Sequence, residues 1–201
     1  MLFLSIILSY LLGAVPASYI MGRVWKGIDL REHGSGNVGA ANTFRVLGPV
    51  PGIIVLFIDV LKGLIAVLLI SRLAMGSSLS SEWVKVFCGI AAICGHNWTI
   101  FLRFKGGRGV ATSTGVFLGL AWQAMLLVIL VWLVIVALTR YISLGSILGA
   151  VALPILVYTL NAPLPYLFFS VLASLLVIIK HIPNIKRLIK GKENRLSFRK
   201  K

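Results

Sequence analysis

Residues 34–45, GSGNVGAANTFR, form a small and polar stretch between two segments that are apolar enough to cross a membrane. Its three glycines within six positions allow successive backbone N–H groups to turn toward a common point, an arrangement that favours an oxyanion. Arg45 at its end can add a planar fork of donors. The stretch therefore indicates an anion site at a membrane surface, and the alternative is a flexible loop between helices. No strand is predicted before it, which argues against a dinucleotide-binding fingerprint.

The composition excludes a water-soluble protein with a single core. Of the 201 residues 59% are apolar and 12% are charged, and the mean hydropathy is +0.99. These values predict an integral membrane protein. The net charge of +15 fits loops beside anionic lipid headgroups, so we expect membrane lipids as partners and no nucleic acid. The two cysteines, Cys88 and Cys94, fall on different faces of one predicted helix, so neither a disulfide nor a metal site is expected.

Hydropathy predicts an all-α polytopic membrane protein, a bundle of seven transmembrane helices that forms one domain over residues 1–201. The first apolar run lacks a basic segment before it and is interpreted as a retained helix, not a signal peptide. The run from Gly109 to Thr139 is too long for a single span, and Gly119, Trp122 and Gln123 mark its predicted break. The expected spans are residues 2–22, 51–70, 83–101, 109–120, 123–139, 142–160 and 164–179.

The distribution of Lys and Arg predicts the orientation. With the N-terminus outside and the C-terminus cytoplasmic, 17 of the 20 basic residues lie on the inner side, in agreement with the positive-inside rule. The glycine-rich loops and the basic tail then share the cytoplasmic face. They can therefore build one site there.

A second glycine-rich stretch, residues 95–113, reads GHNWTIFLRFKGGRGVATS. Its end leads into the short fourth helix, whose free N–H groups and dipole favour an anion. Lys105, Gly106, Gly107 and Gly109 are therefore candidate phosphate-binding residues. The alternative, an inside anchor of basic residues, leaves the three glycines unexplained.

Two buried ionisable features lie within the spans. His96 near the end of the third span is either a functional group or a histidine that packs between helices. The position four residues after it is Ile100, so the His–Asp pair by which acyltransferases with soluble donors activate a hydroxyl is missing. Asp59 and Lys62 lie three residues apart on one helix and are expected to pair in the bundle interior, with a structural role favoured.

The third stretch, residues 180–195, reads KHIPNIKRLIKGKENR. A basic run after a last span is commonly an anchor that binds anionic lipid. Asn184, Lys186 and Glu193 include groups that such an anchor does not need.

Together the three stretches resemble the bacterial family of membrane-integral glycerol-3-phosphate acyltransferases that use acyl-phosphate as donor. The family's motifs match residues 34–48, 95–115 and 181–195, and the stretches DVLKG at 59–63 and RYISL at 140–144 are also similar. The resemblance implies acyl transfer to the 1-hydroxyl of glycerol 3-phosphate, with lysophosphatidic acid as product, as the first step of phospholipid synthesis in the cell membrane. It implies no cofactor. Pro183 in the third motif departs from the family pattern and is expected to alter the start of the helix beside His181.

The same resemblance assigns the candidate site residues, which would line one pocket together with Asn97. The catalytic candidates are Ser35, His96 and Asn184. The candidates for binding substrate phosphate are Gly36, Gly39, Arg45, Lys105, Gly106, Gly107, Gly109, Ser143 and His181.

Two questions stay open at this point. The proton of the attacking hydroxyl can go to His96 or to a phosphate oxygen of the donor, and the lack of a nearby carboxylate in sequence favours the donor phosphate. The competing classes are a transporter for an anionic metabolite, which the absence of an evident inverted repeat disfavours, and a lipid-binding scaffold, which predicts no dependence on Ser35 or His96.

Overall fold

The structure is a computed structural model that describes residues 1–74 and 76–196. Helices and the turns between them account for the described chain, and none of its residues forms a strand. The chain divides into two compact units, Met1–Leu120 and Ala121–Lys201, and each is described by itself. The helical architecture confirms the predicted all-α fold class.

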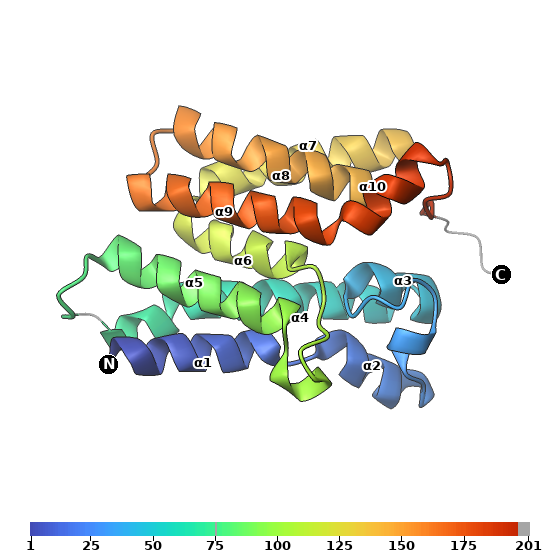
Figure 1. Cartoon of the computed structure of the whole chain (residues 1–201), viewed down its shortest axis with the longest axis horizontal. Coiled ribbons are helices and arrows are strands. Elements are labelled where there is room, and N and C mark those ends of the chain that lie inside the picture. Colours follow the sequence, from blue (N-terminus) through green and yellow to red (C-terminus); the bar gives the residue numbers. More distant parts are fainter. Residues whose placement is uncertain (75, 197–201) are drawn as a thin grey trace. The chain divides into compact units, whose positions relative to one another are not determined.

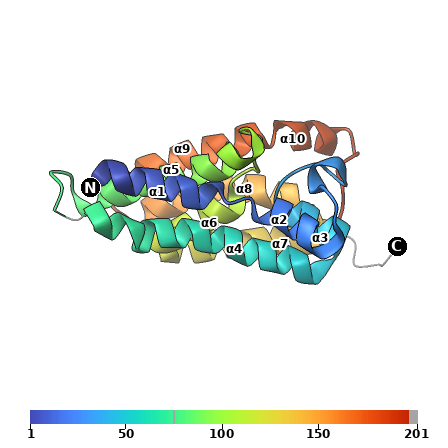
Figure 2. The same ribbon diagram turned by 90° about the horizontal axis from the view of Figure 1, so that it is seen from below.

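The N-terminal unit is built around one long helix. Its α-helices are α1 (Leu2–Ala14), α2 (Ala17–Lys26), α3 (Ala40–Leu47), α4 (Pro49–Leu68), α5 (Ser81–Asn97) and α6 (Val110–Leu120), with short 3-10 turns at Leu30–Glu32, Ile70–Ala74 and Ile100–Leu102. Helix α4 contacts α3, α5 and α6, and α1 lies along α5 (Figures 1 and 2). The loops that carry the first two motifs connect α2 to α3 and α5 to α6.

The first predicted span is confirmed as a candidate membrane span over Leu2–Lys26, but it is broken into α1 and α2 and is not one continuous helix. Pro16 lies at the break and is the N-cap of α2. Proline has no backbone N–H and its ring disfavours helix in the preceding residue, which explains why α1 ends at Ala14. Helix α2 ends at Gly27, which takes the left-handed conformation at φ 69°.

Glycines allow the helices of this unit to approach closely. A Cβ atom at Gly115 of α6 would meet the carbonyl oxygen of Val60, and one at Gly63 of α4 would meet that of Thr112. A Cβ atom at Gly95 of α5 would likewise meet the carbonyl oxygen of Tyr10 of α1. In a membrane, where lipid is as apolar as the side chains, such backbone contact supplies much of the packing energy between helices.

The C-terminal unit contains α7 (Trp122–Thr139), α8 (Ile142–Thr159), α9 (Leu164–Lys180) and α10 (Ile182–Ile189). Helix α8 contacts both α7 and α9, and α10 continues α9 after a bend of 56° (Figure 1). Pro183 lies in the first turn of α10, a position where its missing N–H costs no hydrogen bond. The end of α6 at Leu120 and the start of α7 at Trp122 confirm the predicted break.

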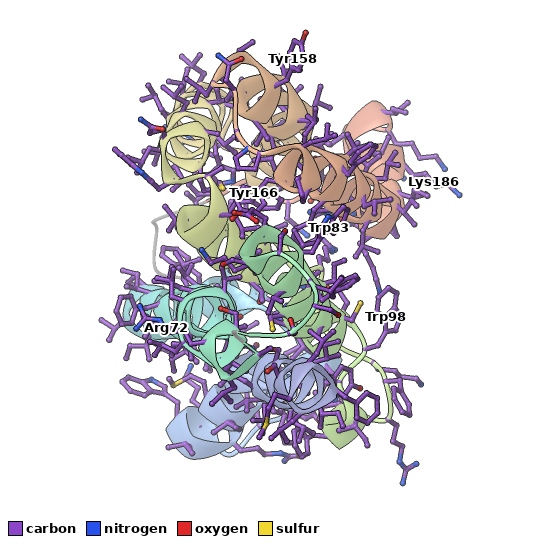
Figure 3. The ribbon with its side chains drawn as sticks, turned by 90° about the vertical axis from the view of Figure 1, so that its left-hand side faces the viewer. Arg72, Trp83, Trp98, Tyr158, Tyr166 and Lys186 are labelled. Carbon is purple, nitrogen blue, oxygen red and sulfur yellow. The ribbon has the colours of Figure 1, made fainter. Side chains whose placement is uncertain are left out.

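Within residues 1–74 and 76–196, length and composition identify five helical segments that can cross a membrane, or six if the bent pair α9 and α10 is one span. Helix α6 is apolar but has only 11 residues, so the seven-span count rests on a helix that falls short of a full crossing. Large apolar side chains on the outer faces are exposed, as lipid contact requires, including Leu138 at 78% and Tyr158 at 69%. Figure 3 shows Tyr158 projecting away from α8.

We predict that Gly115→Ala separates α4 from α6 and lowers stability by about 1–3 kcal/mol, because the added methyl group meets the backbone of Val60. The measurement is the apparent unfolding temperature in detergent. Gly149→Ala in α8 is the control, since its methyl group meets the Val128 side chain at 3.3 Å and comes no closer than 4.0 Å to the Val128 backbone. Equal unfolding temperatures for the two variants would contradict the prediction.

Candidate active site

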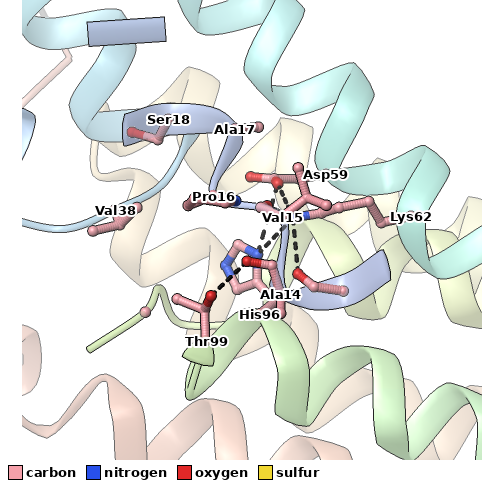
Figure 4. A pocket seen from close by; sticks show the side chains of 12 residues that line it. Ala14, Val15, Pro16, Ala17, Ser18, Val38, Asp59, Lys62, His96 and Thr99 are labelled. Atoms are coloured by element: carbon pink, nitrogen blue, oxygen red, sulfur yellow. Dashed lines mark hydrogen bonds and ion pairs between the residues drawn. The ribbon is translucent and has the colours of Figure 1, made fainter. Parts of the chain in front are cut away.

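A small cavity in the N-terminal unit brings together the helix break, both glycine-rich loops and a buried charged cluster (Figure 4). Its volume of about 10 Å³ corresponds to roughly one water molecule. It is lined by Gly13, Ala14, Val15, Pro16, Ala17, Ser18, Val38, Asp59, Lys62, His96, Thr99 and Gly106. Val38 belongs to the first predicted motif, and His96 and Gly106 belong to the second.

Lys62 and Asp59 of α4 pair in the interior as predicted, at 2.7 Å between Nζ and Oδ1. Both are almost completely buried, at 3% and 2% exposure. The ammonium also donates to the carbonyl oxygens of Gly13 at 3.2 Å and Val15 at 2.9 Å. Thr99 donates to the intervening carbonyl of Ala14 at 2.5 Å. The three carbonyls at the helix break therefore all have donors supplied by other segments.

His96 stands beside this ion pair. Its Nδ1 lies 3.4 Å from Lys62 Nζ and 3.7 Å from Asp59 Oδ1. No carboxylate lies close to His96 along the sequence, but Asp59 of a different helix lies beside the imidazole in space. A pattern search restricted to residues following His96 could not find it.

Asn42 organises the loop of the first motif. Its side chain is fully buried and accepts bonds from the Ser35 N–H at 2.8 Å and the Ser35 hydroxyl at 3.1 Å. Its amide nitrogen donates to the carbonyls of Leu30 and His33. Sequence reasoning did not single out Asn42, although its place seven residues after Ser35 on a helix is visible in the motif.

The backbone of this loop does not present the predicted convergent set of N–H groups at its glycines. Gly36 donates to the carbonyl of His33 and Gly39 to that of Asn37. Gly36 is required because its φ is +68°, a left-handed conformation that other residues rarely adopt. The role of these two glycines in phosphate binding stays a prediction.

Asp29 anchors the entry to the same loop. Hydrogen bonds from the Arg31 guanidinium, at 2.6 Å for the shortest, hold the pKa of Asp29 at about 2, and the Arg23 guanidinium adds a weaker attraction at 3.4 Å. The Asp29 side chain caps the short turn before the motif by accepting from the Arg31 N–H.

The second glycine-rich loop is fastened to the end of α5. Gly106 donates to the carbonyl of Asn97 at 3.3 Å and Gly107 to that of His96 at 3.0 Å, so these N–H groups too are used internally. Side chains at these positions would collide with α5: a Cβ at Gly107 would meet His96 Nε2, and one at Gly106 would meet the His96 carbonyl. Close approach to His96 and Asn97 thus explains these two glycines.

Polar side chains without a hydrogen bond gather where this loop enters α6. The amide of Asn97 and the hydroxyls of Thr112 and Ser113 are buried and have no partner within the described structure. Unpaired buried polar groups are rare and mark places where a polar ligand can be accepted. Lys105 and Arg45 are exposed on the two motif segments, as cations that bind a substrate phosphate need to be.

In the C-terminal unit, Glu193 connects the predicted residues. Ser143 Oγ donates to its Oε1 at 3.1 Å and Asn184 Nδ2 to the same oxygen at 2.8 Å, while Arg187 donates to Oε2 at 2.7 Å. His181 is buried at the C-terminus of α9, with Nδ1 2.8 Å from the carbonyl of Val177. Ser143 and Asn184 therefore lie close together because both donate to Glu193 Oε1. Glu193 was noted in the sequence, but no role was predicted for it.

Three comparisons bear on this arrangement. The family model described as Glycerol-3-phosphate acyltransferase matches residues 3–191. The chain is 47% identical to "Glycerol-3-phosphate acyltransferase 2" of Moorella thermoacetica over 98% of both chains, and 47% identical to the glycerol-3-phosphate acyltransferase of Desulforamulus reducens over 97% of this chain and 95% of that one.

Crystal structures of the integral membrane glycerol 3-phosphate acyltransferase PlsY (YgiH) are similar in fold. Its glycerol 3-phosphate form gives a TM-score of 0.89 at 37% identity, covering 98% of this chain and 96% of that one. Its lysophosphatidic acid form gives 0.86 at 36% identity, with 98% and 95% covered.

The Glu193 contacts predict a pH-dependent contribution to stability. Burial alone raises the pKa of this carboxyl, but hydrogen bonds from Asn184, Arg187 and Ser143 outweigh it and hold the pKa below its ordinary value. A lowered native pKa gives stability that is complete above the unfolded-state pKa and is lost as the pH falls through the native one. We therefore expect Glu193→Gln to unfold at a lower temperature than the wild type at about pH 7, with the gap closing in acid. A gap that does not change with pH would contradict this assignment.

Proposed function

Because the chain belongs to the glycerol-3-phosphate acyltransferase family, we propose that it transfers an acyl chain from acyl-phosphate to the 1-hydroxyl of glycerol 3-phosphate, giving lysophosphatidic acid and phosphate. The observation that carries the proposal is the match of fold over nearly the full chain to an integral membrane acyltransferase solved in glycerol 3-phosphate and lysophosphatidic acid forms. The membrane acyltransferase class fits the long apolar helices and the polar loops at their ends.

An acyl-phosphate donor suits the chemistry that these residues can perform. A mixed anhydride is already activated, so the protein needs to align a hydroxyl with the carbonyl carbon, neutralise phosphate charge and stabilise the leaving phosphate. Alignment alone can contribute about 7–11 kcal/mol to lowering the barrier. Preorganised hydrogen-bond donors supply the rest without a covalent intermediate.

We assign the binding of the substrates to cationic and polar side chains of the three motifs. Arg45 and Lys105 are exposed and can bind phosphate by charge-assisted hydrogen bonds. Ser35 is held in place by Asn42, which supports a role in contacting substrate. We assign Ser143, His181 and Asn184 to substrate binding as well, with Glu193 fixing the serine and the asparagine in the absence of ligand.

We assign the proton of the attacking hydroxyl to a phosphate oxygen of the donor, with His96 as a positioning residue. The imidazole is only 8% exposed, and its Nε2 edge lies against Gly107. A general base needs hydrogen-bond access to the proton it removes, which this packing restricts. The nearby Asp59 removes one argument for this assignment, since a carboxylate does lie close to the ring.

We further propose seven crossings, with the N-terminus outside and the site on the cytoplasmic face. In this topology α1 with α2 forms the first crossing and α6, the short helix, forms the fourth. The support is the concentration of Lys and Arg in the loops assigned to the inner side.

Incubating the purified protein with glycerol 3-phosphate and an acyl donor tests the function directly. We expect lysophosphatidic acid from acyl-phosphate and none from acyl-CoA, because the candidate base His96 is packed against Gly107 and the proposed proton acceptor is the phosphate of the acyl-phosphate. Turnover with acyl-CoA that equals or exceeds turnover with acyl-phosphate would contradict the assignment of acyl-phosphate as the donor. No product from either donor would favour the transporter or the scaffold.

Arg45→Ala and Lys105→Ala are each expected to remove about 1.5–3 kcal/mol of charge-assisted interaction, which corresponds to a loss of roughly 10- to 150-fold in kcat/KM. Steady-state kinetics with glycerol 3-phosphate and acyl-phosphate varied in turn shows which substrate each residue contacts. Lys85→Ala on α5 is the matched control and should keep normal kinetics. Unchanged kinetics in the two test variants would mean that these cations serve topology alone.

A further inference from the structure

We propose that the Asp59–Lys62 ion pair of α4 positions His96 for acyl transfer, with the Lys62 ammonium donating to Nδ1 and the imidazole carrying its proton on Nε2. The inference deepens the proposed function and rests on it. It gives a role in the reaction to a buried pair for which the sequence favoured a structural role alone.

The geometry around Nδ1 selects between two neighbours. An ammonium can only donate a hydrogen bond and a carboxylate can only accept one. Lys62 Nζ lies 3.4 Å from Nδ1, within hydrogen-bond distance, whereas Asp59 Oδ1 lies 3.7 Å away, beyond it. Nδ1 therefore accepts, and a neutral imidazole whose Nδ1 accepts carries its hydrogen on Nε2.

Lys62 is held for this role by three acceptors besides His96, namely Asp59 Oδ1 and the carbonyls of Gly13 and Val15. His96 Nδ1 is the fourth acceptor around three N–H donors, so one N–H is shared between the imidazole and a neighbouring acceptor. The carboxylate supplies the opposite charge that a buried ammonium needs, and the two carbonyls fix its direction. The contact to His96 is the longest of the four, so we expect a small shift of Lys62 to break the hydrogen bond to the imidazole before the other three contacts.

The other edge of His96 faces the loops of the two motifs. Nε2 lies beside Gly107, and the carbonyl oxygen of Val38 lies near the same point. A protonated Nε2 is a donor directed toward this junction. His96 therefore orients the loops and any oxygen that enters between them, and it is not the proton acceptor.

The same ammonium connects His96 to the first motif through the helix break. Lys62 fixes the break, and α2 begins directly after it. Ser18 of α2 bonds Thr43 of α3 at 2.8 Å between the hydroxyls, and the neighbouring Asn42 holds Ser35. A loss of Lys62 therefore disturbs both the imidazole and the serine loop.

The first test is the protonation of the two imidazole nitrogens, read from ¹⁵N chemical shifts of histidine in the full chain in lipid nanodiscs. His96→Gln assigns the signal among the three histidines. We expect an unprotonated Nδ1 and a protonated Nε2 in the wild type and in the control Lys85→Met, and a changed pattern in Lys62→Met. A protonated Nδ1 in the wild type, or the same pattern in Lys62→Met, would overturn the proposal. This readout does not depend on activity, so it stands even if no lysophosphatidic acid is formed and the proposed function fails.

The second test separates positioning from folding. Removing one partner leaves a buried charge unpaired and can prevent folding, whereas Asp59→Asn combined with Lys62→Met removes both charges. We expect this double variant to unfold closer to the wild type than either single variant does, with KM largely kept and kcat reduced about 10- to 100-fold. A folded double variant with kcat within about twofold of the wild type would show that the pair is only structural.

Discussion

The ammonium of Lys62 is the interaction on which the N-terminal unit depends. A helix that breaks inside a bilayer leaves carbonyl groups without donors, and no water is available to satisfy them. Here Pro16 breaks the first helix, and Lys62 supplies donors to the carbonyls of Gly13 and Val15. Because a buried cation is itself costly, the break requires Asp59 beside it. Pro16, Lys62 and Asp59 therefore depend on one another, although they lie on two different helices.

The glycine-rich loops are rigid parts of this arrangement and not open sets of N–H groups. Gly106 and Gly107 donate to the last carbonyls of α5, and Gly36 and Gly39 donate within their own loop. The lack of a side chain at Gly106 and Gly107 lets the backbone of their loop approach His96 and Asn97 closely. In the proposed function, the positive charge that binds the substrate phosphates therefore comes from side chains at the edges of these loops. The orphaned amide of Asn97 with Thr112 and Ser113 adds neutral polar groups beside them.

The sequence was sufficient for the fold class, the break between α6 and α7 and the pairing of Asp59 with Lys62, because each follows from hydropathy or from helical spacing. It was insufficient for the break at Pro16, since a proline in an apolar run is compatible with a kink as well as an end. It also missed the contact of Asp59 with His96, because residues 37 positions apart meet only through the packing of α4 on α5. The roles of Asn42 and Glu193 depend on loop conformations that no periodic pattern encodes.

Each of these features positions a group, and in the proposed function His96 likewise orients groups while the donor phosphate takes the proton. The direct measurement is kcat of His96→Asn and His96→Ala from about pH 5.5 to about pH 8.5. Asparagine keeps a hydrogen-bonding group but cannot take up the proton, so we expect activity within about tenfold of the wild type for His96→Asn and a much larger loss for His96→Ala. A loss of ~10³-fold or more in both variants, with an acidic limb in the wild-type profile that both variants lack, would identify His96 as the base and rule out the donor phosphate as proton acceptor.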